Sequence, residues 1–391
     1  MSYSLMNATQ TTLSMLEAPI NGKHSALAVC SRKPIRDSVV LTMNESQQLA
    51  IQGLATCGSW LCPHCREIKL KRMAESLKKV RTRCANDNLT TQMITLTVPS
   101  QRNVELDLLL QVLSLAWKTV FGSNSTGRRN KSNLGLVDFR YVRCLEVNST
   151  VFTDEYNRDI TSAGLTLKDY DNNRAELLHD LRPVYNRYVS FHAHYHLILI
   201  GHELTEQQQE YLQLEWAKAV YLLCLKYHIS ANFFDVLQHF VYVSEPVQGF
   251  SNSYFTWDEL TGKKHARQAN SYNFNDIVRK QNSLLFQLIY FEYTQALRGK
   301  SKFTVSHNLW SWAEQEQEQQ EEQEQQEKPK SEPIAELPID TWHLILNANQ
   351  ADNLLQCKTF EQVYWFTFDF LSRISRFSFF AMPISLAERH L

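Results

Sequence analysis

The sequence predicts an α+β protein in which helices flank a central antiparallel sheet. Three segments, 92–100, 139–148 and 187–201, are rich in the β-branched and aromatic residues that favour strands. Residues 104–121 and 204–228 instead repeat apolar side chains at helical spacing. We therefore expect strand and helix to alternate through the middle of the chain.

Residues that typically begin or end helices and strands mark the boundaries of these elements. The strand at 92–100 stops at Pro99, and the helix at 204–228 opens with the capping sequence TEQQ. Residues 149–186 are rich in Asp, Asn and Arg, and we interpret them as an insertion between two strands. We further predict a helix over 233–245 and another over 283–299 that stops at its final glycine.

The charge pattern divides the chain. The formal net charge is −1, but residues 314–327 carry seven Glu and no base, so the rest of the chain carries +6. A tract of this kind cannot bury apolar surface and is typical of a solvated linker. We expect four parts: an N-terminal cysteine-bearing region with a basic helix (1–88), a central domain (89–310), the Glu/Gln-rich linker (311–333) and a helical C-terminal tail (334–391).

Targeting signals are not evident in the sequence. It has no run of about 18 apolar residues, and its N-terminus lacks a basic stretch followed by an apolar one. Eight Cys scattered along a long chain argue against a disulfide framework. We therefore expect no membrane span and a location in the reducing cytoplasm.

The cysteine block CGSWLCPHC predicts a metal site. Cys57, Cys62 and Cys65 are spaced so that their thiolates can reach one ion, and structural Zn²⁺ takes four such ligands. The fourth ligand is Cys30 or His64, and we favour Cys30 because His64 lies between two ligands. The alternatives are a redox CxxC, which lacks a βαβ context here, and unligated core cysteines. We expect Cys84, Cys144, Cys224 and Cys357 to be core residues.

A strongly basic segment follows the cysteine block. Over residues 66–83 it has two Glu against eight basic residues: Arg66, Lys69, Lys71, Arg72, Lys78, Lys79, Arg81 and Arg83. As a helix it would offer a positive surface suited to nucleic-acid phosphates, and Arg66, Lys69 and Arg72 are our candidate DNA contacts. The alternative is an ordinary solvated helix face.

Three histidines alternate in FHAHYHLILI. His192, His194 and His196 share one face of a strand, because side chains two residues apart point the same way. Burying imidazoles without partners is costly, so a divalent ion is the natural partner. Glu146, inside the preceding strand, is the best anionic ligand. Such a mixed site suits Mg²⁺ or Mn²⁺ acting on a phosphoryl oxygen, and the alternative for Glu146 is a solvated strand-edge carboxylate.

Several motifs in order resemble the HUH-type rolling-circle replication initiators of plasmids. They are GLATCGSWLCPHC, MITLTVP, LEVN, HAHYHLILI, YVSE, ELTGKKHAR and EYTQALRGKSKFTVSHNL, and they cover roughly residues 30–310. The resemblance implies an HUH-endonuclease-like sheet and a tyrosine nucleophile, which motif order places at Tyr242. The family usually shows Tyr-x-x-Lys there, whereas this chain has Glu245 at the lysine position, and Tyr254 is a second candidate. Further basic residues could hold the cut strand: Lys263, Lys264, Arg267, Arg298, Lys300 and Lys302.

The resemblance also implies a mechanism and partners. The tyrosine would attack a phosphate of a single-stranded or hairpin origin, leaving a 5′-phosphotyrosine and a 3′-OH that primes a host polymerase, with a host helicase as further partner. The alternatives are a non-catalytic zinc-containing nucleic-acid-binding protein, a metal-dependent hydrolase of small phosphate esters, and a transposase or relaxase relative.

Overall fold

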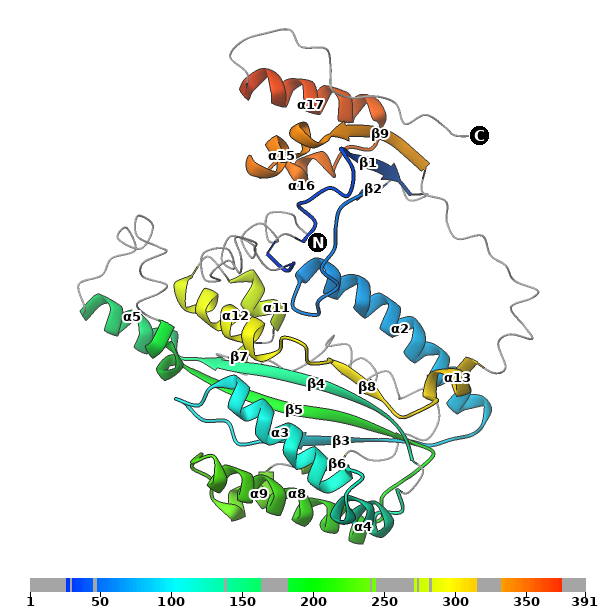
Figure 1. Ribbon diagram of the computed structural model, residues 1–391, viewed down its shortest axis with the longest axis vertical. Helices are drawn as coiled ribbons and strands as arrows, with labels where there is room; N and C mark the ends of the chain where they lie inside the picture. Colours follow the sequence, from blue (N-terminus) through cyan, green and yellow to red (C-terminus); the bar gives the residue numbers. More distant parts are fainter. Residues whose placement is uncertain are drawn as a thin grey trace. The chain divides into compact units, whose positions relative to one another are not determined.

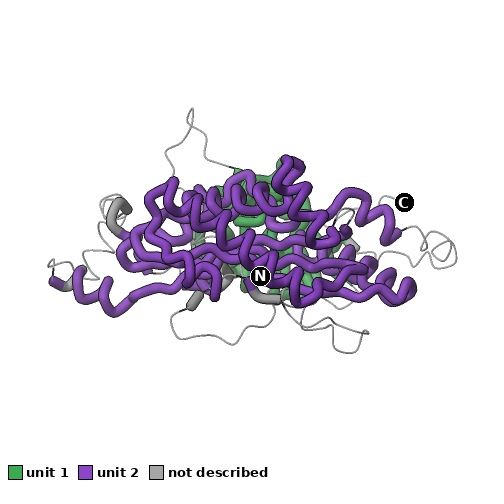
Figure 2. The backbone as a smooth tube through the Cα atoms, turned by 90° about the horizontal axis from the view of Figure 1, so that it is seen from below, with its two compact units in different colours: residues 1–67, 320–391 green, residues 68–319 purple. Residues whose placement is uncertain are grey.

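The protein separates into two compact units. The computed structural model describes residues 26–28, 30–44, 48–136, 139–162, 182–239, 241–243, 271–272, 274–280, 283–314 and 332–374. One unit comprises residues 1–67 and 320–391, and the other residues 68–319 (Figure 2). This division differs from the four consecutive segments expected from the sequence, because the C-terminal segment folds together with the N-terminal one.

The smaller unit is a three-stranded sheet with helices. Its order is β2-β1-β9, and all neighbours are antiparallel. The strands are β1 (Ser38–Met43), β2 (Leu49–Gln52) and β9 (Glu332–Pro338), and the helices that follow are α15 (Ile339–Asn347), α16 (Ala351–Leu354) and α17 (Phe360–Ile374). The tail that we expected to be helical therefore also supplies a strand.

Its core draws on both ends of the chain. Leu41 of β1, Leu337 of β9, Trp342 of α15 and Val363 of α17 belong to one cluster, and each has 0% exposure. Burying such side chains contributes about 2 kcal/mol each, so β9 and the three helices are integral to this unit.

The basic segment after the cysteine block is a helix, α2 (Pro63–Asn86), as predicted. Its apolar side chains Leu77, Val80 and Cys84 are buried, at three- and four-residue spacing. The boundary between the two units falls in the first turns of this helix, after Glu67.

The larger unit contains an antiparallel sheet of six strands in the order β6-β3-β5-β4-β7, with β8 also pairing with β4 (Figure 1). The strands are β3 (Thr91–Thr97), β4 (Arg140–Val151), β5 (Val189–Ile200), β6 (Val241–Val243), β7 (Ser271–Tyr272) and β8 (Phe303–Val305). The predicted α+β class, with antiparallel sheets flanked by helices, is confirmed.

Four of the helices described in this unit fall in segments predicted to be helical: α3 (Leu106–Phe121), α8 (Glu206–Lys226), α9 (Phe233–His239) and α12 (Leu284–Ala296). The other helices described are α4 (Ser125–Asn133), α5 (Thr153–Ser162), the 3₁₀ helix η1 (Arg182–Tyr188), α11 (Phe274–Arg279) and α13 (Leu309–Glu314). Thr205 caps α8 through the expected capping box with Gln208. None of the helices described is long and apolar enough to cross a membrane.

Two sequence predictions differ from the structure. The helix expected over 233–245 is split, because α9 ends at His239 and β6 pairs with β3. The insertion expected over 149–186 begins later, since β4 continues to Val151 and α5 follows, while residues 163–181 lie outside the described part.

One face of the sheet is covered by helices. Trp117 of α3 packs edge-on against Tyr195 of β5, and Tyr293 of α12 does so against Phe191. Figure 1 shows α3 and α8 side by side on that side of the sheet. Side chains of β5 at even positions, which include the three histidines, therefore point to the opposite face.

Candidate metal centres

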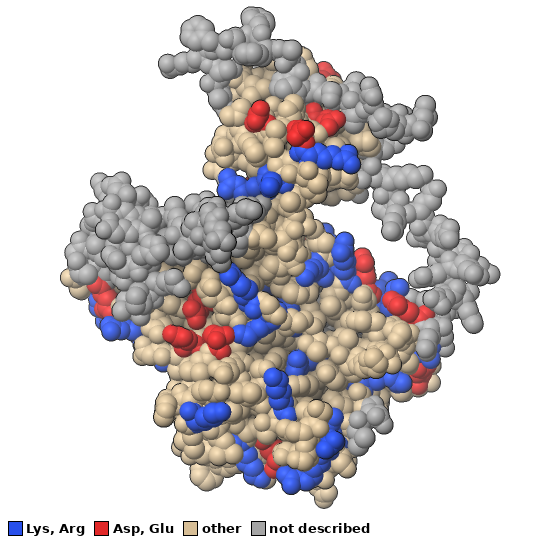
Figure 3. Space-filling model, viewed as in Figure 1, with Lys and Arg blue, Asp and Glu red and all other residues tan. Residues whose placement is uncertain are grey.

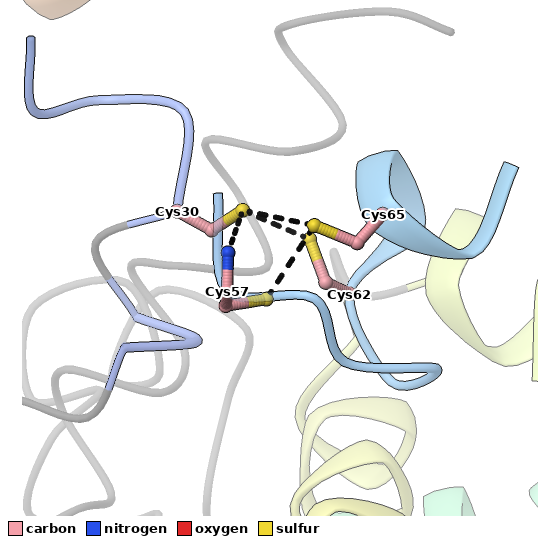
Figure 4. Close-up of side chains that lie close together, drawn as sticks. All are labelled: Cys30, Cys57, Cys62 and Cys65. Carbon is pink, nitrogen blue, oxygen red and sulfur yellow. Dashed lines mark hydrogen bonds between the residues drawn. The ribbon is translucent and has the colours of Figure 1, made fainter. Parts of the chain in front are cut away.

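Four cysteines converge in the smaller unit (Figure 4). Cys30 comes from the loop before β1, Cys57 from the loop after β2, and Cys62 and Cys65 from the start of α2. The two last thiols can converge because the first turn of a helix begins between them. All four sulfur atoms lie within 4.8 Å of one another, and Cys30, Cys62 and Cys65 are buried.

The spacing of the sulfur atoms fits zinc. Cys30 Sγ lies 3.4 Å from Cys62 Sγ and 3.5 Å from Cys65 Sγ, and Cys57 Sγ lies 3.7 Å from Cys65 Sγ. A tetrahedron with Zn–S bonds of about 2.3 Å has edges of about 3.8 Å. A disulfide would need about 2.05 Å, so these thiols are not bonded pairwise. This cluster could hold Zn²⁺.

The four thiols share protons unequally. Hydrogen bonds from Cys57 and Cys62 lower the pKa of Cys30 to about 7, and those from Cys30 and Cys57 lower the pKa of Cys65. Hydrogen bonding to Cys30 raises the pKa of Cys57 and Cys62. A divalent cation at the centre would bind all four groups as thiolates and displace their remaining protons.

The cluster selects Cys30 over His64 as the fourth member. His64 is half-buried and is not part of the group of clustered side chains. Cys84, Cys144 and Cys224 are buried and do not belong to the cluster, and burial raises the pKa of Cys84 to about 12 and of Cys224 to about 11.

The second group lies in the larger unit, on β4 and β5. These strands pair so that Glu146 is directly opposite His194, and His196 is opposite Cys144. Directly paired residues share a face, so the carboxylate and both imidazoles lie on the same side of the sheet. Glu146, His194 and His196 form the second group of side chains that could hold a metal ion.

The three ligand atoms are in mutual contact. Glu146 Oε2 lies 3.0 Å from His196 Nε2 and 3.6 Å from His194 Nε2, and the two Nε2 atoms are 3.1 Å apart. Ligands of an octahedral Mg²⁺ at about 2.1 Å are about 3 Å apart, and ligands of tetrahedral Zn²⁺ only slightly more. Separations of this size suit three adjacent ligands of one cation.

A threonine fixes the orientation of one imidazole. Thr95 of β3 is paired with His196, and its Oγ1 lies 3.1 Å from His196 Nδ1. When Nδ1–H donates to this hydroxyl, the Nε2 lone pair points toward Glu146 and a shared cation. Thr95 was not predicted from the sequence as part of the site. Its position in the strand segment TLT, where alternate residues share a face, is the only sequence feature that could have indicated it.

The carboxylate is ionised. Burial alone would raise the pKa of Glu146, but hydrogen bonds from His194 and His196 outweigh it and hold the pKa well below its usual range. The side chains of Glu146, His194 and His196 retain 14%, 12% and 6% exposure. A cation bound here would keep some coordination positions for water or an incoming oxygen.

The third histidine is separate from this group. His192 is exposed and pairs with Asn148, one step further along the same face, and it is not among the three clustered ligands. It is therefore placed beside the centre and not in it.

The expected nucleophile lies on a neighbouring strand. Tyr242 in β6 pairs with Thr95, which pairs with His196, so its Cα is two strand spacings, about 10 Å, from that of His196. The side chain of Tyr242 lies outside the described part of the structure, as does the whole of Tyr254.

The predicted DNA contacts are spread over several elements. Arg66, Lys69 and Arg72 lie on α2, and Arg72 is exposed. Lys300 makes an ion pair with Asp107 at 2.6 Å, and Arg298 follows α12. Lys263, Lys264 and Arg267 lie outside the described residues.

No family model matches the sequence, and neither a curated protein nor a solved structure shows significant similarity to it.

Proposed function

We propose that the protein is a metal-dependent DNA-nicking and DNA-joining enzyme of the HUH type, acting as a rolling-circle replication initiator. The observation that carries the proposal is the arrangement of Glu146, His194 and His196 on one face of the sheet, with Tyr242 paired in register with Thr95, the strand neighbour of His196. A cation beside the phosphate assists phosphoryl transfer to a phenol, and the nucleophile must come within a few ångströms of phosphorus.

The reaction exchanges one phosphodiester for another. Mg²⁺ or Mn²⁺, when bound, would polarise a non-bridging oxygen of the scissile phosphate. Tyr242 would attack phosphorus, forming an O–P bond, while the bond to the 3′ oxygen breaks and that oxygen takes up the phenolic proton. The products are a 5′-phosphotyrosine and a free 3′-OH. Glu146 would hold the cation, and the hydrogen bond between Thr95 Oγ1 and His196 Nδ1 would orient the imidazole with Nε2 toward it.

The four-cysteine cluster has a different part in this proposal. We assign it a structural Zn²⁺, since a closed set of four thiolates leaves no position for a substrate. It would fix the loop that carries Cys30 and the loop that carries Cys57 against the first turn of α2. The basic side chains of that helix would then be presented in one orientation to DNA phosphates.

A covalent-trapping experiment tests the proposal. The substrate is a pool of single-stranded oligonucleotides with randomised hairpins, labelled at the 3′ end and incubated with the protein and Mn²⁺. The label should remain on the protein through denaturing electrophoresis, and peptide mapping should find it on Tyr242. Tyr242→Phe should abolish the adduct, whereas Tyr254→Phe, the matched control, should retain it. If Tyr242→Phe still forms the adduct and Tyr254→Phe does not, the nucleophile is Tyr254 and not Tyr242.

A second candidate function is a non-catalytic nucleic-acid-binding protein with two structural metal sites. The low exposure of the His196 side chain, 6%, favours it, because a catalytic cation must admit a substrate oxygen. The same experiment decides between them: bound DNA without any covalent adduct, in the presence of either Mg²⁺ or Mn²⁺, identifies the non-catalytic protein.

A further inference from the structure

A second basic surface lies on α4 and the end of α3. Between Asp107 and Asp138 the sequence has no acidic residue and four basic ones: Lys118, Arg128, Arg129 and Lys131. Three of these lie on α4, and Lys118 lies in the last turn of α3. None of the motifs that resemble the replication initiators includes this segment.

The helix α4 is held firmly against α3. A Cβ on Gly127 would meet Gly122 O at 2.5 Å, so only glycine permits this approach of the two backbones. The Asn124 side chain caps α4 by accepting from Gly127 N at 2.7 Å. Asn130 is fully buried and accepts a hydrogen bond from Tyr211 of α8 at 2.8 Å. These interactions fix which side of the helix faces water.

The outward side of α4 has the composition of a phosphate-binding surface. Arg128 and Arg129 are exposed, and Ser125 and Ser132 are exposed beside them. Arg, Lys, Ser and Asn are the side chains that most often contact nucleic-acid phosphates. Figure 3 shows Lys and Arg side chains gathering at the lower end of the larger unit, the region that Figure 1 labels α4 and α8.

These cations have no acidic partner among the described residues. None of the four forms an ion pair or a side-chain hydrogen bond there, whereas Arg83 pairs with Asp87, Arg102 with Glu155 and Lys300 with Asp107. An anionic ligand would therefore not have to displace an internal carboxylate. Two adjacent exposed arginines next to a lysine can neutralise consecutive phosphates.

The surface favours duplex over single-stranded DNA. Proteins that bind single strands stack bases on exposed aromatic side chains, and no residue of α4 is aromatic.

We propose that the exposed face of α4, with Lys118, binds the phosphate backbone of duplex DNA. This inference rests on the proposed function for the role of the duplex, but the binding itself does not depend on cleavage. Interactions with the DNA backbone carry no sequence information, so the surface would position the DNA and leave recognition to other residues.

The test measures binding in buffer without added Mg²⁺ or Mn²⁺, where no metal-dependent cleavage occurs and the Zn²⁺ of the four-cysteine cluster is retained. The probe is a fluorescein-labelled duplex of 20 random base pairs, read by anisotropy between about 50 and 200 mM salt. Arg128→Gln/Arg129→Gln should weaken binding about 10-fold for each arginine replaced at about 0.1 M salt, and should lower the slope of log K against log salt by about 2. The matched control, Arg279→Gln/Lys358→Gln, removes two other exposed cations and should bind like the parent.

The outcomes are distinct. Unchanged affinity and an unchanged salt slope in Arg128→Gln/Arg129→Gln would overturn the proposal. An equal weakening for a single-stranded 20-mer would show that α4 binds the single strand, which also overturns it. Weaker duplex binding in the α4 variant alone supports it, whether or not the parent protein proves able to form a covalent adduct. Far-ultraviolet circular dichroism of each variant establishes that the helix content is that of the parent.

Discussion

Replacing Cys62 by serine is the sharpest test of the four-cysteine cluster. Cys62 Sγ lies 3.4 Å from Cys30 Sγ, and Cys62 is only 1% exposed, so no water can readily take the place of the missing thiolate. Structural Zn²⁺ sites are worth about 10–16 kcal/mol, which is about 3 kcal/mol for each of four ligands. We therefore expect Cys62→Ser to bind Zn²⁺ about 100-fold more weakly than the parent.

The assay is zinc content per chain followed by competition with a chromogenic chelator under reducing conditions. The parent should carry one Zn²⁺ at the cluster, and Cys62→Ser should release it at far lower chelator concentration and unfold at lower temperature. Cys357→Ser is the control, because this half-buried thiol lies outside the cluster. A parent that takes up no Zn²⁺, or a Cys62→Ser protein that holds it as tightly, would refute the tetrahedral assignment.

The remaining predictions concern the Glu146 centre. Thr95→Val should weaken Mn²⁺ binding by about 10–100-fold, measured by calorimetry, and Thr95→Ser should restore it because the hydroxyl that contacts His196 returns; equal affinity in all three proteins would remove Thr95 from the site. In metal-free protein, the stabilising interactions of Glu146 should be fully present above the unfolded carboxyl pKa of about 4.3 and should disappear as pH falls through its lower folded pKa. The difference in unfolding free energy between the parent and Glu146→Gln should therefore shrink toward acid below about pH 5, and a difference that grows would contradict this sign.

Local chemistry in the sequence was sufficient for the elements that carry the centre. The β-rich segment over 187–201 forms β5, and the capping sequence at Thr205 opens α8 where expected. Strand alternation alone puts the three histidines on one face. These features depend on residues within a few positions of one another, which is why a sequence can reveal them.

Long-range pairing was not accessible in this way. Residues 332–338 have no signal that selects β1 as partner about 300 positions earlier, yet β1 and β9 pair along their whole length. The apolar spacing over 233–245 is compatible with either a helix or a strand, and we predicted a helix. After His239 the chain instead forms β6, which pairs with β3. His192 shares the face of the other histidines, but no carboxylate is opposite it, since Asn148 occupies that register position.

The register of β4 against β5 is what brings Glu146 to the imidazoles, and it is fixed from the other side of the sheet. A shift of one residue would move Glu146 to the opposite face and separate it from both histidines. On that opposite face Arg143 lies between the rings of Trp117 and Tyr195, 4.2 and 4.4 Å from their centroids, and donates to Thr304 Oγ1 at 3.2 Å. A neighbouring register would remove Arg143 from this position, at a cost of about 1–2 kcal/mol for each desolvated cation–π interaction. Metal affinity at Glu146 therefore depends on side chains that never touch the metal, because they set the strand pairing from which the ligand geometry follows.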